Sequence, residues 1–306
     1  MSQLPISEYP LLSDCHSAAL VSRDGSIDWL CFPRIDGPPV FARLLDERGG
    51  HWSLRPVAEA EARRRYQDQT MLLETTFRTA TGGATLVDAM AVGRNERGHE
   101  MGAGAPSVGL RQVTGIDGEV AFELDYAPCL EYGLASPVLE VVEGGVMARG
   151  GADVLALSCP LPLAVDGFRA RARVRVRAGE TVSFALHHRS TSQEKPRLWS
   201  QAEVAERVAD TAEAWRTWSS LHQSYEGPWR HLVHESGRVL YALTYYPTGA
   251  RVLGSFSVLK YTISLTLYTM AIQPGPRDVI RGDGFSKAAV AREVQASTRG
   301  RLRGDG

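Results

Sequence analysis

The chain has 306 residues, of which 43% are hydrophobic and 23% charged, a composition typical of a globular protein with one large or two modest domains. The formal net charge of −1 gives no general attraction to nucleic acid or to anionic membranes. The four cysteines form no Cys-x-x-Cys pair, which predicts buried free thiols in a reducing compartment. No basic start followed by an apolar run opens the chain, so we expect a cytoplasmic protein.

From residue 10 to about 190 the sequence predicts antiparallel hairpins. Asp24-Gly25 separates two apolar segments and suits a two-residue turn, which requires positive backbone dihedrals. Gly82-Gly83 and Asp117-Gly118 mark two further turns. Within 119–126, apolar residues alternate with mostly acidic ones, as in a sheet with one buried face. The fold class predicted is therefore mainly β, an antiparallel β-sandwich followed by two linker helices and an irregular tail.

The segment from Phe168 to Ala178 places five arginines on one side of a predicted strand, at every second position from 169 to 177. Such a row could bind phosphate or nucleic acid. It could equally be a solvated outer face, opposed by Glu119, Glu123 and Asp125 on a neighbouring strand. The near-neutral net charge favours the second interpretation, and we expect no nucleic-acid partner.

Two helices follow the predicted sandwich. Ser200 and Glu203 form a capping-box pattern, which opens a helix with its apolar stripe at 204, 208, 211, 215 and 218. Pro228 suits the first position of a second helix, and Pro247 ends it. The predicted organisation is a sandwich domain over 1–199, linker helices over 200–250 and a divergent tail over 251–306.

The tail contains the apolar span Val252 to Ile272, but Lys260 in its middle makes a membrane segment unfavourable. Tyr261 to Leu267 alternates like a strand, and the chain beyond Pro274 is rich in glycine and charge. This change of composition suits a truncated or out-of-frame ending. An unpaired strand edge and uncovered helix faces predict self-association, or a tail that folds back.

Several segments together carry a family resemblance. They are Ile6-Ser7-Glu8-Tyr9, Ser13-Asp14-Cys15, Gly25-Ser26-Ile27-Asp28-Trp29-Leu30-Cys31, Val87-Asp88-Ala89-Met90, Arg111 and Tyr246-Pro247-Thr248-Gly249-Ala250. The chain resembles the opening of glycoside hydrolase family 15, the glucoamylase- and trehalase-like proteins, which begin with a β-sandwich and continue into a helical (α/α)6 barrel. After Ala250 the resemblance ends, and 56 residues remain where such a barrel needs roughly 200.

The resemblance implies the N-terminal domain of an α-glucoside hydrolase acting on trehalose or a maltooligosaccharide. The family's catalytic glutamates lie in the barrel, so no catalytic residue carries over and the chain alone is expected to be inactive. A barrel encoded separately is then a possible partner. The alternative is a free-standing module that binds carbohydrate or a partner protein. No zinc-ligand spacing, phosphate loop or dinucleotide fingerprint occurs, so no cofactor or metal is predicted.

The candidate substrate-binding residues are Asp28, Trp29, Arg34 and Asp36. An aromatic face stacks on a sugar ring, while flanking carboxylates and a guanidinium bind its hydroxyl groups. The alternative is that Trp29 is a core residue and the three charged residues hold turns. Carboxylate pairs also occur, as glycoside hydrolysis requires, but the sequence places none in a cleft. These pairs are Asp24 with Asp28, Glu74 with Asp88, and Glu140 with Glu143.

Overall fold

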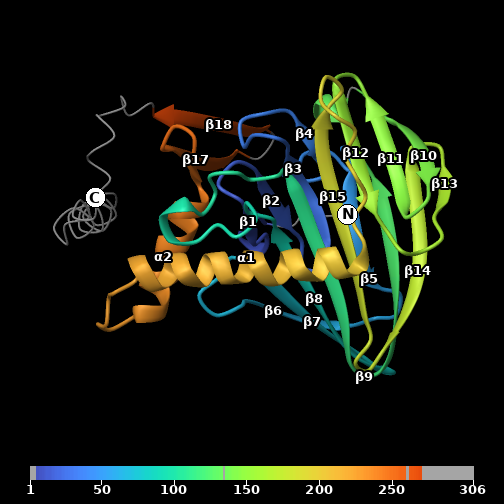
Figure 1. Cartoon of the computed structure of the whole chain (residues 1–306), viewed down its shortest axis with the longest axis horizontal. Helices are drawn as coiled ribbons and strands as arrows, with labels where there is room; N and C mark the ends of the chain where they lie inside the picture. Colours follow the sequence, from blue (N-terminus) through green and yellow to red (C-terminus); the bar gives the residue numbers. More distant parts are fainter. Residues whose placement is uncertain (1–4, 134, 260–261, 271–306) are drawn as a thin grey trace. The chain divides into compact units, whose positions relative to one another are not determined.

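The computed structural model describes residues 5–133, 135–259 and 262–270, with side chains up to Ala250. Strands dominate, and two α-helices follow them, α1 (Gln201–His222) and α2 (Arg230–Ala242) (Figure 1). The strands preceding the helices are β1 (Leu11–Ser13), β2 (Ala18–Val21), β3 (Ser26–Cys31), β4 (Pro39–Phe41), β5 (His51–Pro56), β6 (Glu61–Tyr66), β7 (Leu73–Thr79), β8 (Gly82–Met90), β9 (Val108–Ala127), β10 (Val138–Val142), β11 (Gly145–Gly150), β12 (Asp153–Ser158), β13 (Ala164–Asp166), β14 (Arg169–Arg177) and β15 (Thr181–Ser190). The predicted mainly β fold with two later helices is confirmed.

The long strand β9 belongs to both layers of the sheet. Its first half pairs with β8 and β15, and its second half pairs with β5 and β14, all antiparallel. The change occurs at Gly115 to Gly118, where a Cβ on Gly115 would collide with the carbonyl of Arg177. One 15-stranded sheet therefore folds into two layers, with the main strand order β1-β2-β3-β5-β9-β15-β12-β11-β10.

Apolar side chains from both layers fill the space between them. The register of β9 with β14 sets Val120 opposite Val176, and Phe122 opposite Val174. Phe122 also meets Phe77 of β7 edge to face, with ring centroids 5.9 Å apart. Burying each such side chain stabilises the fold by about 1.5–3 kcal/mol. The largest fully buried apolar side chains are Trp52, Tyr126, Phe41, Phe77, Phe122 and Phe184, apart from Trp215 on α1.

The arginine row of β14 forms an ion-pair ladder with β9. Arg169 lies 2.9 Å from Asp125, and Arg173 lies 3.0 Å from Glu123. Arg177 pairs with Glu119 at 3.0 Å. The prediction that acidic residues of a neighbouring strand oppose the arginines is confirmed. Because these side chains are largely exposed, each pair contributes only about 0.2–1 kcal/mol.

Helix α1 begins with the predicted capping box. The Ser200 hydroxyl accepts the Glu203 amide hydrogen, and the Glu203 carboxylate accepts that of Ser200. A hydrogen bond from Arg197, followed by those at the cap, lowers the pKa of Glu203 to about 2. The predicted stripe from residue 204 to 218 is buried, and α1 lies against β15, β8 and β9.

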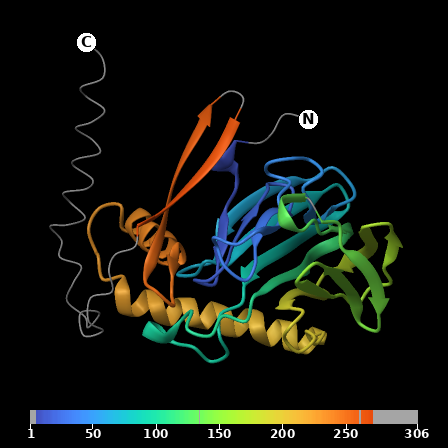
Figure 2. The ribbon, with the colours of Figure 1, turned by 90° about the horizontal axis from the view of Figure 1, so that it is seen from above.

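Helix α2 begins at Arg230, two residues later than Pro228 predicts, because Trp229 adopts a left-handed conformation before it. Beyond α2, strands β16 (Thr244–Tyr245), β17 (Ala250–Leu259) and β18 (Thr262–Met270) form an antiparallel sheet, whose orange to red hairpin is visible in Figure 2. Strand β18 matches the predicted alternation, although Tyr261 lies outside the described residues. The glycine-rich and charged ending also lies outside them. No helix in the described ranges is long and apolar enough to cross a membrane.

Candidate functional site

A β-bulge at Asp28 sets the direction of the candidate residues on β3. Trp29 and Ile27 pair with consecutive residues of β2, so Asp28 is the extra residue. A bulge interrupts strict alternation and re-aims the side chains beside it. As a result, Ile27 and Leu30 both belong to the main core, whereas Trp29 packs in a separate small cluster.

The Asp28 carboxylate is buried and fully engaged. It accepts hydrogen bonds from the hydroxyls of Ser26 at 2.7 Å and Tyr9 at 3.1 Å, and it pairs with Arg43 at 2.6 Å. Burial, reinforced by this carboxylate, raises the pKa of Tyr9 far above its usual range. The Asp28 carbonyl also accepts the amide hydrogen of Leu44. Asp28 therefore holds the chain around residues 43–44 in contact with the bulge.

Trp29 is only 9% exposed. It packs with Leu20 of β2 and Cys31 of β3, and the chain after β4 adds Ala42, Leu44 and Leu45. Little of the indole is therefore free to stack on a ligand. Trp29 therefore packs against the same segment, around residues 43–44, that Asp28 holds in place.

Arg34 and Asp36 lie apart from that pair, on the surface. Their side chains are 53% and 46% exposed and form two parallel hydrogen bonds, of 2.8 and 2.7 Å. The bond from Arg34 holds the pKa of Asp36 below its usual range. The Arg34 guanidinium lies 5.0 Å from the ring centroid of Tyr245, and the His16 ring meets the same tyrosine edge-on at 5.4 Å. We call His16, Arg34, Asp36 and Tyr245 the junction cluster, because Tyr245 lies between α2 and β17.

The loop before β2 holds this cluster against the end of α2. One Asp14 carboxylate oxygen accepts the amide hydrogens of His16 at 2.9 Å and Ser17 at 2.6 Å. Ser13 donates a hydrogen bond to the carbonyl of Ala242, and the Tyr246 amide donates to the carbonyl of Cys15. Burial raises the pKa of Asp14 to about 6. The loop thus joins the start of the sandwich to the point where the chain leaves it.

Sequence reasoning missed His16 and Tyr245 as members of the site. They are more than two hundred residues apart, and no local pattern connects them. The available signal was indirect, because each lies next to a segment that carries the family resemblance. Ser13-Asp14-Cys15 precedes His16, and the run Tyr246 to Ala250 follows Tyr245.

A buried ion pair holds the turn that leads into β3. Arg111 and Asp88 are fully buried and pair at 2.8 Å. Arg111 also donates to the carbonyls of Trp52 and Gly25, each at 2.7 Å. Gly25 has a φ of +80°, and a Cβ there would lie 2.7 Å from the Leu54 carbonyl oxygen. These contacts give Arg111, Asp88 and Gly25 a structural role.

Members of two of the three carboxylate pairs suggested by the sequence are held by other partners. Asp88 forms its buried ion pair with Arg111, and Glu74 pairs with Arg65 at 2.8 Å. Asp28 pairs with Arg43, as described above. Within the described part of the chain, no group of three or more His, Cys, Asp or Glu side chains is placed to hold a metal ion.

A protein-family model described as "Trehalase-like, N-terminal" matches residues 1–215. The chain belongs to this family. The sequence is 34% identical over 276 residues to a protein named trehalase from Mycolicibacterium smegmatis, covering 84% of this chain and 41% of that protein. A trehalase from Mycobacterium tuberculosis is 33% identical over 276 residues, covering 84% of this chain and 40% of that protein. The chain therefore spans about two fifths of the length of these relatives.

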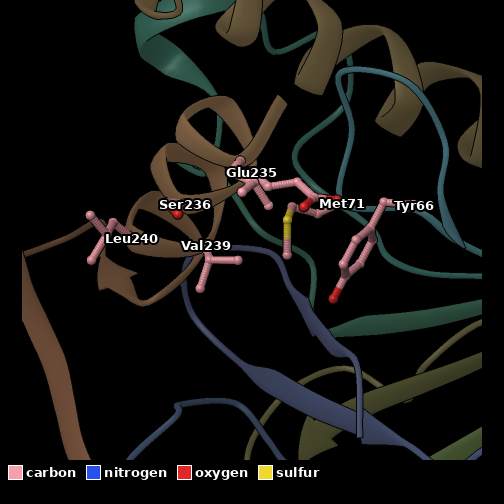
Figure 3. Close-up of a pocket in the computed structure, with 7 residues that line it drawn as sticks. Tyr66, Met71, Glu235, Ser236, Val239 and Leu240 are labelled. Atoms are coloured by element: carbon pink, nitrogen blue, oxygen red, sulfur yellow. The ribbon is translucent and has the colours of Figure 1, made fainter. Parts of the chain in front are cut away.

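Two hollows occur on the described part of the chain, and none of the four candidate residues lines either of them. The first, of about 480 Å³, lies beside α2 (Figure 3). It is lined by Tyr66, Met71, Leu232, Glu235, Ser236, Val239 and Leu240. The second, of about 620 Å³, shares Tyr66 and Glu235 with it and is otherwise lined mainly by the chain before β1 and by β6. The junction cluster is thus a surface feature and lines neither hollow.

Proposed function

We propose that this chain is the N-terminal domain of a family 15 glycoside hydrolase, of the trehalase or glucoamylase kind, and that it supports a catalytic barrel acting on an α-glucoside. The observation that carries the proposal is the match of residues 1–215 to the trehalase-like N-terminal family, in a chain that spans two fifths of its trehalase relatives. The four buried free thiols suit the reducing cytoplasm as its location.

In this proposal the junction cluster contacts the sugar. Tyr245 supplies an aromatic face, while the paired side chains of Arg34 and Asp36 offer donors and acceptors to hydroxyl groups. Within the cluster, Tyr245 lies directly before the segment at which the family resemblance ends. Asp28 and Trp29 act more remotely, because they shape the chain around residues 43–44.

The chain alone is proposed to be inactive. Glycoside hydrolysis requires one protonated and one ionised carboxyl group on opposite sides of the scissile bond. Asp28, Glu74 and Asp88 are held in ion pairs, so their carboxylate oxygens are engaged by arginines and are not free to act on a substrate. Enzymes lower such barriers by about 8–23 kcal/mol, and nothing in the described residues supplies that amount.

A complementation experiment tests the supporting role. The segment of the Mycolicibacterium smegmatis trehalase that follows its matched region is expressed separately, and glucose release from trehalose is measured with and without this chain. We expect this chain to raise the activity and Arg34→Ala to reduce the gain. Arg48→Ala is the matched control, because Arg48 is 92% exposed and lies outside the cluster. Equal gains with both variants would contradict a role for the junction cluster.

The free-standing binding module is the second candidate, favoured by a junction cluster that is complete and half exposed in this chain. Titration calorimetry with trehalose and with maltotriose separates the two candidates. Measurable binding by the chain alone, lost in Arg34→Ala, would favour the module. No binding without the barrel segment is the result that the supporting role predicts.

A further inference from the structure

Strand β6 has an unpaired edge within the described part of the chain, where β7 is its only neighbour. At the turn between the two strands, the Gln67 amide donates to the Leu72 carbonyl, so the backbone of Gln67 points toward β7. Backbone groups alternate in direction along an antiparallel strand, so those of Ala62, Arg64 and Tyr66 point away from β7. These three residues therefore offer hydrogen-bond donors and acceptors along the edge.

The unpaired edge faces the second hollow. Ala62, Arg64 and Tyr66 all line this space of about 620 Å³, and the chain before β1 forms another of its walls. Side chains connect the two walls. Arg64 donates to the carbonyl of Glu8 at 2.6 Å and to its carboxylate at 3.0 Å. The Tyr66 hydroxyl bonds to the amide and the carbonyl of Leu11, each at 2.9 Å. No backbone ladder joins β6 to this wall among the described residues.

Arg23 is the arginine of this hollow that lacks an acidic partner. Arg64 lies 3.0 Å from Glu8, and Arg65 lies 2.8 Å from Glu74. Arg23 also lines the hollow, and it forms no hydrogen bond or ion pair with any residue that the structure describes. Its guanidinium is therefore available to a carboxylate, which it can hold with two parallel hydrogen bonds.

The edge of β6 has a basic end and an apolar end. A Cβ on Gly25 would lie 3.3 Å from the Phe77 ring, and Phe77 pairs with Ala62, so the turn that carries Arg23 lies near the Ala62 end. Tyr66 at the other end also lines the 480 Å³ hollow of Figure 3. The apolar residues of that hollow are Met71, Leu232, Val239 and Leu240.

Glu235 is the acidic side chain that both hollows share at the Tyr66 end. Burial lowers the pKa of Arg238, one helical turn later, and the charge of Glu235 opposes that shift. The negative charge of Glu235 therefore has a basic neighbour in the chain. A carboxylate held near Ala62 lies four residues away along β6, or about 13 Å, so it is remote from Glu235.

We propose that β6 binds an extended segment of a partner protein, which adds to the sheet as an antiparallel strand with an apolar residue opposite Tyr66 and an acidic residue opposite Ala62. Such a strand continues the antiparallel order of β6, β7 and β8. The two partner residues are i and i+4, so their side chains lie on one face of the added strand. Arg23 binds the acidic one, and the apolar hollow receives the other.

Charge argues against a second copy of this chain in that place. Residues 63, 64 and 65 are all arginines, and two β6 strands paired edge to edge would set them against each other. A partner segment with a carboxylate avoids this repulsion and supplies the counter-charge that Arg23 lacks. This inference is independent of the proposed function.

Binding of a labelled peptide, followed by fluorescence anisotropy, tests the proposal. The probe is Thr-Leu-Val-Thr-Val-Glu-Thr with blocked ends, in which leucine and glutamate are four residues apart. We expect saturable binding to the full chain, with a dissociation constant at least about tenfold higher for Arg23→Glu. Arg48→Glu is the matched control, since Arg48 is 92% exposed and lies outside the hollow. Absence of saturable binding, or an equal loss in both variants, would overturn the proposal.

N-Methylation of the peptide tests the geometry of strand addition. A methyl group on the nitrogen of the central threonine, opposite Arg64, removes a hydrogen bond to β6 and should weaken binding at least about tenfold. A methyl group on the preceding valine points away from the edge and should have a much smaller effect. Equal effects would overturn strand addition.

Hydrogen exchange locates the bound peptide on the chain. The amides of Ala62, Arg64 and Tyr66 should exchange rapidly in the free chain and slowly in the complex, because the peptide then accepts their hydrogens. Slow exchange of these amides in the free chain would show that another segment of the same chain already covers the edge, and would overturn the proposal.

Discussion

Helices α1 and α2 both carry an apolar stripe, but the two stripes face different environments. The stripe of α1, with Trp215 and Trp218, is buried against the sheet, while the stripe of α2, with Trp229 and Leu232, faces solvent. The capping box satisfies the backbone amides at the start of α1, whereas Trp229 gives the start of α2 no side-chain hydrogen bond. The periodicity of a helix therefore predicts which residues form its apolar face. Whether another element packs on that face depends on the rest of the chain.

The largest effect is expected from truncating one tryptophan on each helix. Trp215 is 1% exposed and Trp229 is 72% exposed. Trp215→Ala should lower the free energy of unfolding by about 3–5 kcal/mol, since it leaves a cavity in a packed core. Trp229→Ala should leave it nearly unchanged when measured by urea denaturation at low protein concentration. Equal losses in the two variants would show that α2 packs like α1.

Trp29 is a buried tryptophan of the sandwich and can be compared with Trp215 of α1. Because it is buried in its own cluster, Trp29→Ala should lower the free energy of unfolding by about 3–5 kcal/mol. Denaturation and sugar titration are measured on the same variant. An unchanged melting temperature combined with the loss of a measurable sugar affinity would instead give Trp29 a binding role.

The attachment of α1 should depend on pH through His187. Its ring is buried and meets Trp199, next to the start of α1, with ring centroids 4.5 Å apart. Burial lowers the pKa of His187 from about 6.5 to about 4. The unfolded chain therefore binds a proton first as the pH falls, so stability is complete above pH 6.5 and decreases toward pH 4, by about 3 kcal/mol in total.

His187→Gln serves as the control for that pH dependence. The difference in unfolding free energy between the natural chain and the variant should change between pH 7 and pH 4 as described, while carboxylate titrations common to both cancel. A difference that stays constant over this range would contradict the buried neutral imidazole.

A smaller effect is expected at the start of α1. Ser200→Ala removes the hydroxyl that accepts the Glu203 amide hydrogen and should cost about 1 kcal/mol. Ser220→Ala is a suitable control, because Ser220 is exposed near the other end of the same helix. Thermal unfolding that shifts equally in both variants would show that the cap contributes nothing specific.

The sequence was sufficient for elements whose signals are local. The capping box at Ser200 and the arginine alternation of β14 depend on neighbours within a few residues, and the structure confirms them. The hairpin turn predicted at Asp117-Gly118 is wrong, because β9 continues through these residues from one layer into the other. The direction of Trp29 could not be predicted, because the bulge at Asp28 is defined only by its pairing with β2. The junction cluster could not be predicted either, because only the complete fold brings His16 and Tyr245 into contact.

The environment of α2 was predictable only in part. Its apolar residues and their spacing are readable from the sequence, and the structure leaves Trp229 and Leu240 exposed. Periodicity does not name the occupant of such a face, since any apolar surface of matching shape can cover it.

The measurement that tests the account most directly is glucose release from trehalose and from maltose by the purified chain alone. The account predicts no release above the uncatalysed background, because in the proposed function the catalytic carboxyl groups belong to a barrel that these 306 residues support. Arg34→Ala and the natural chain should be indistinguishable in this assay. Turnover by the pure chain that is abolished by replacing one of its carboxylates would contradict the account.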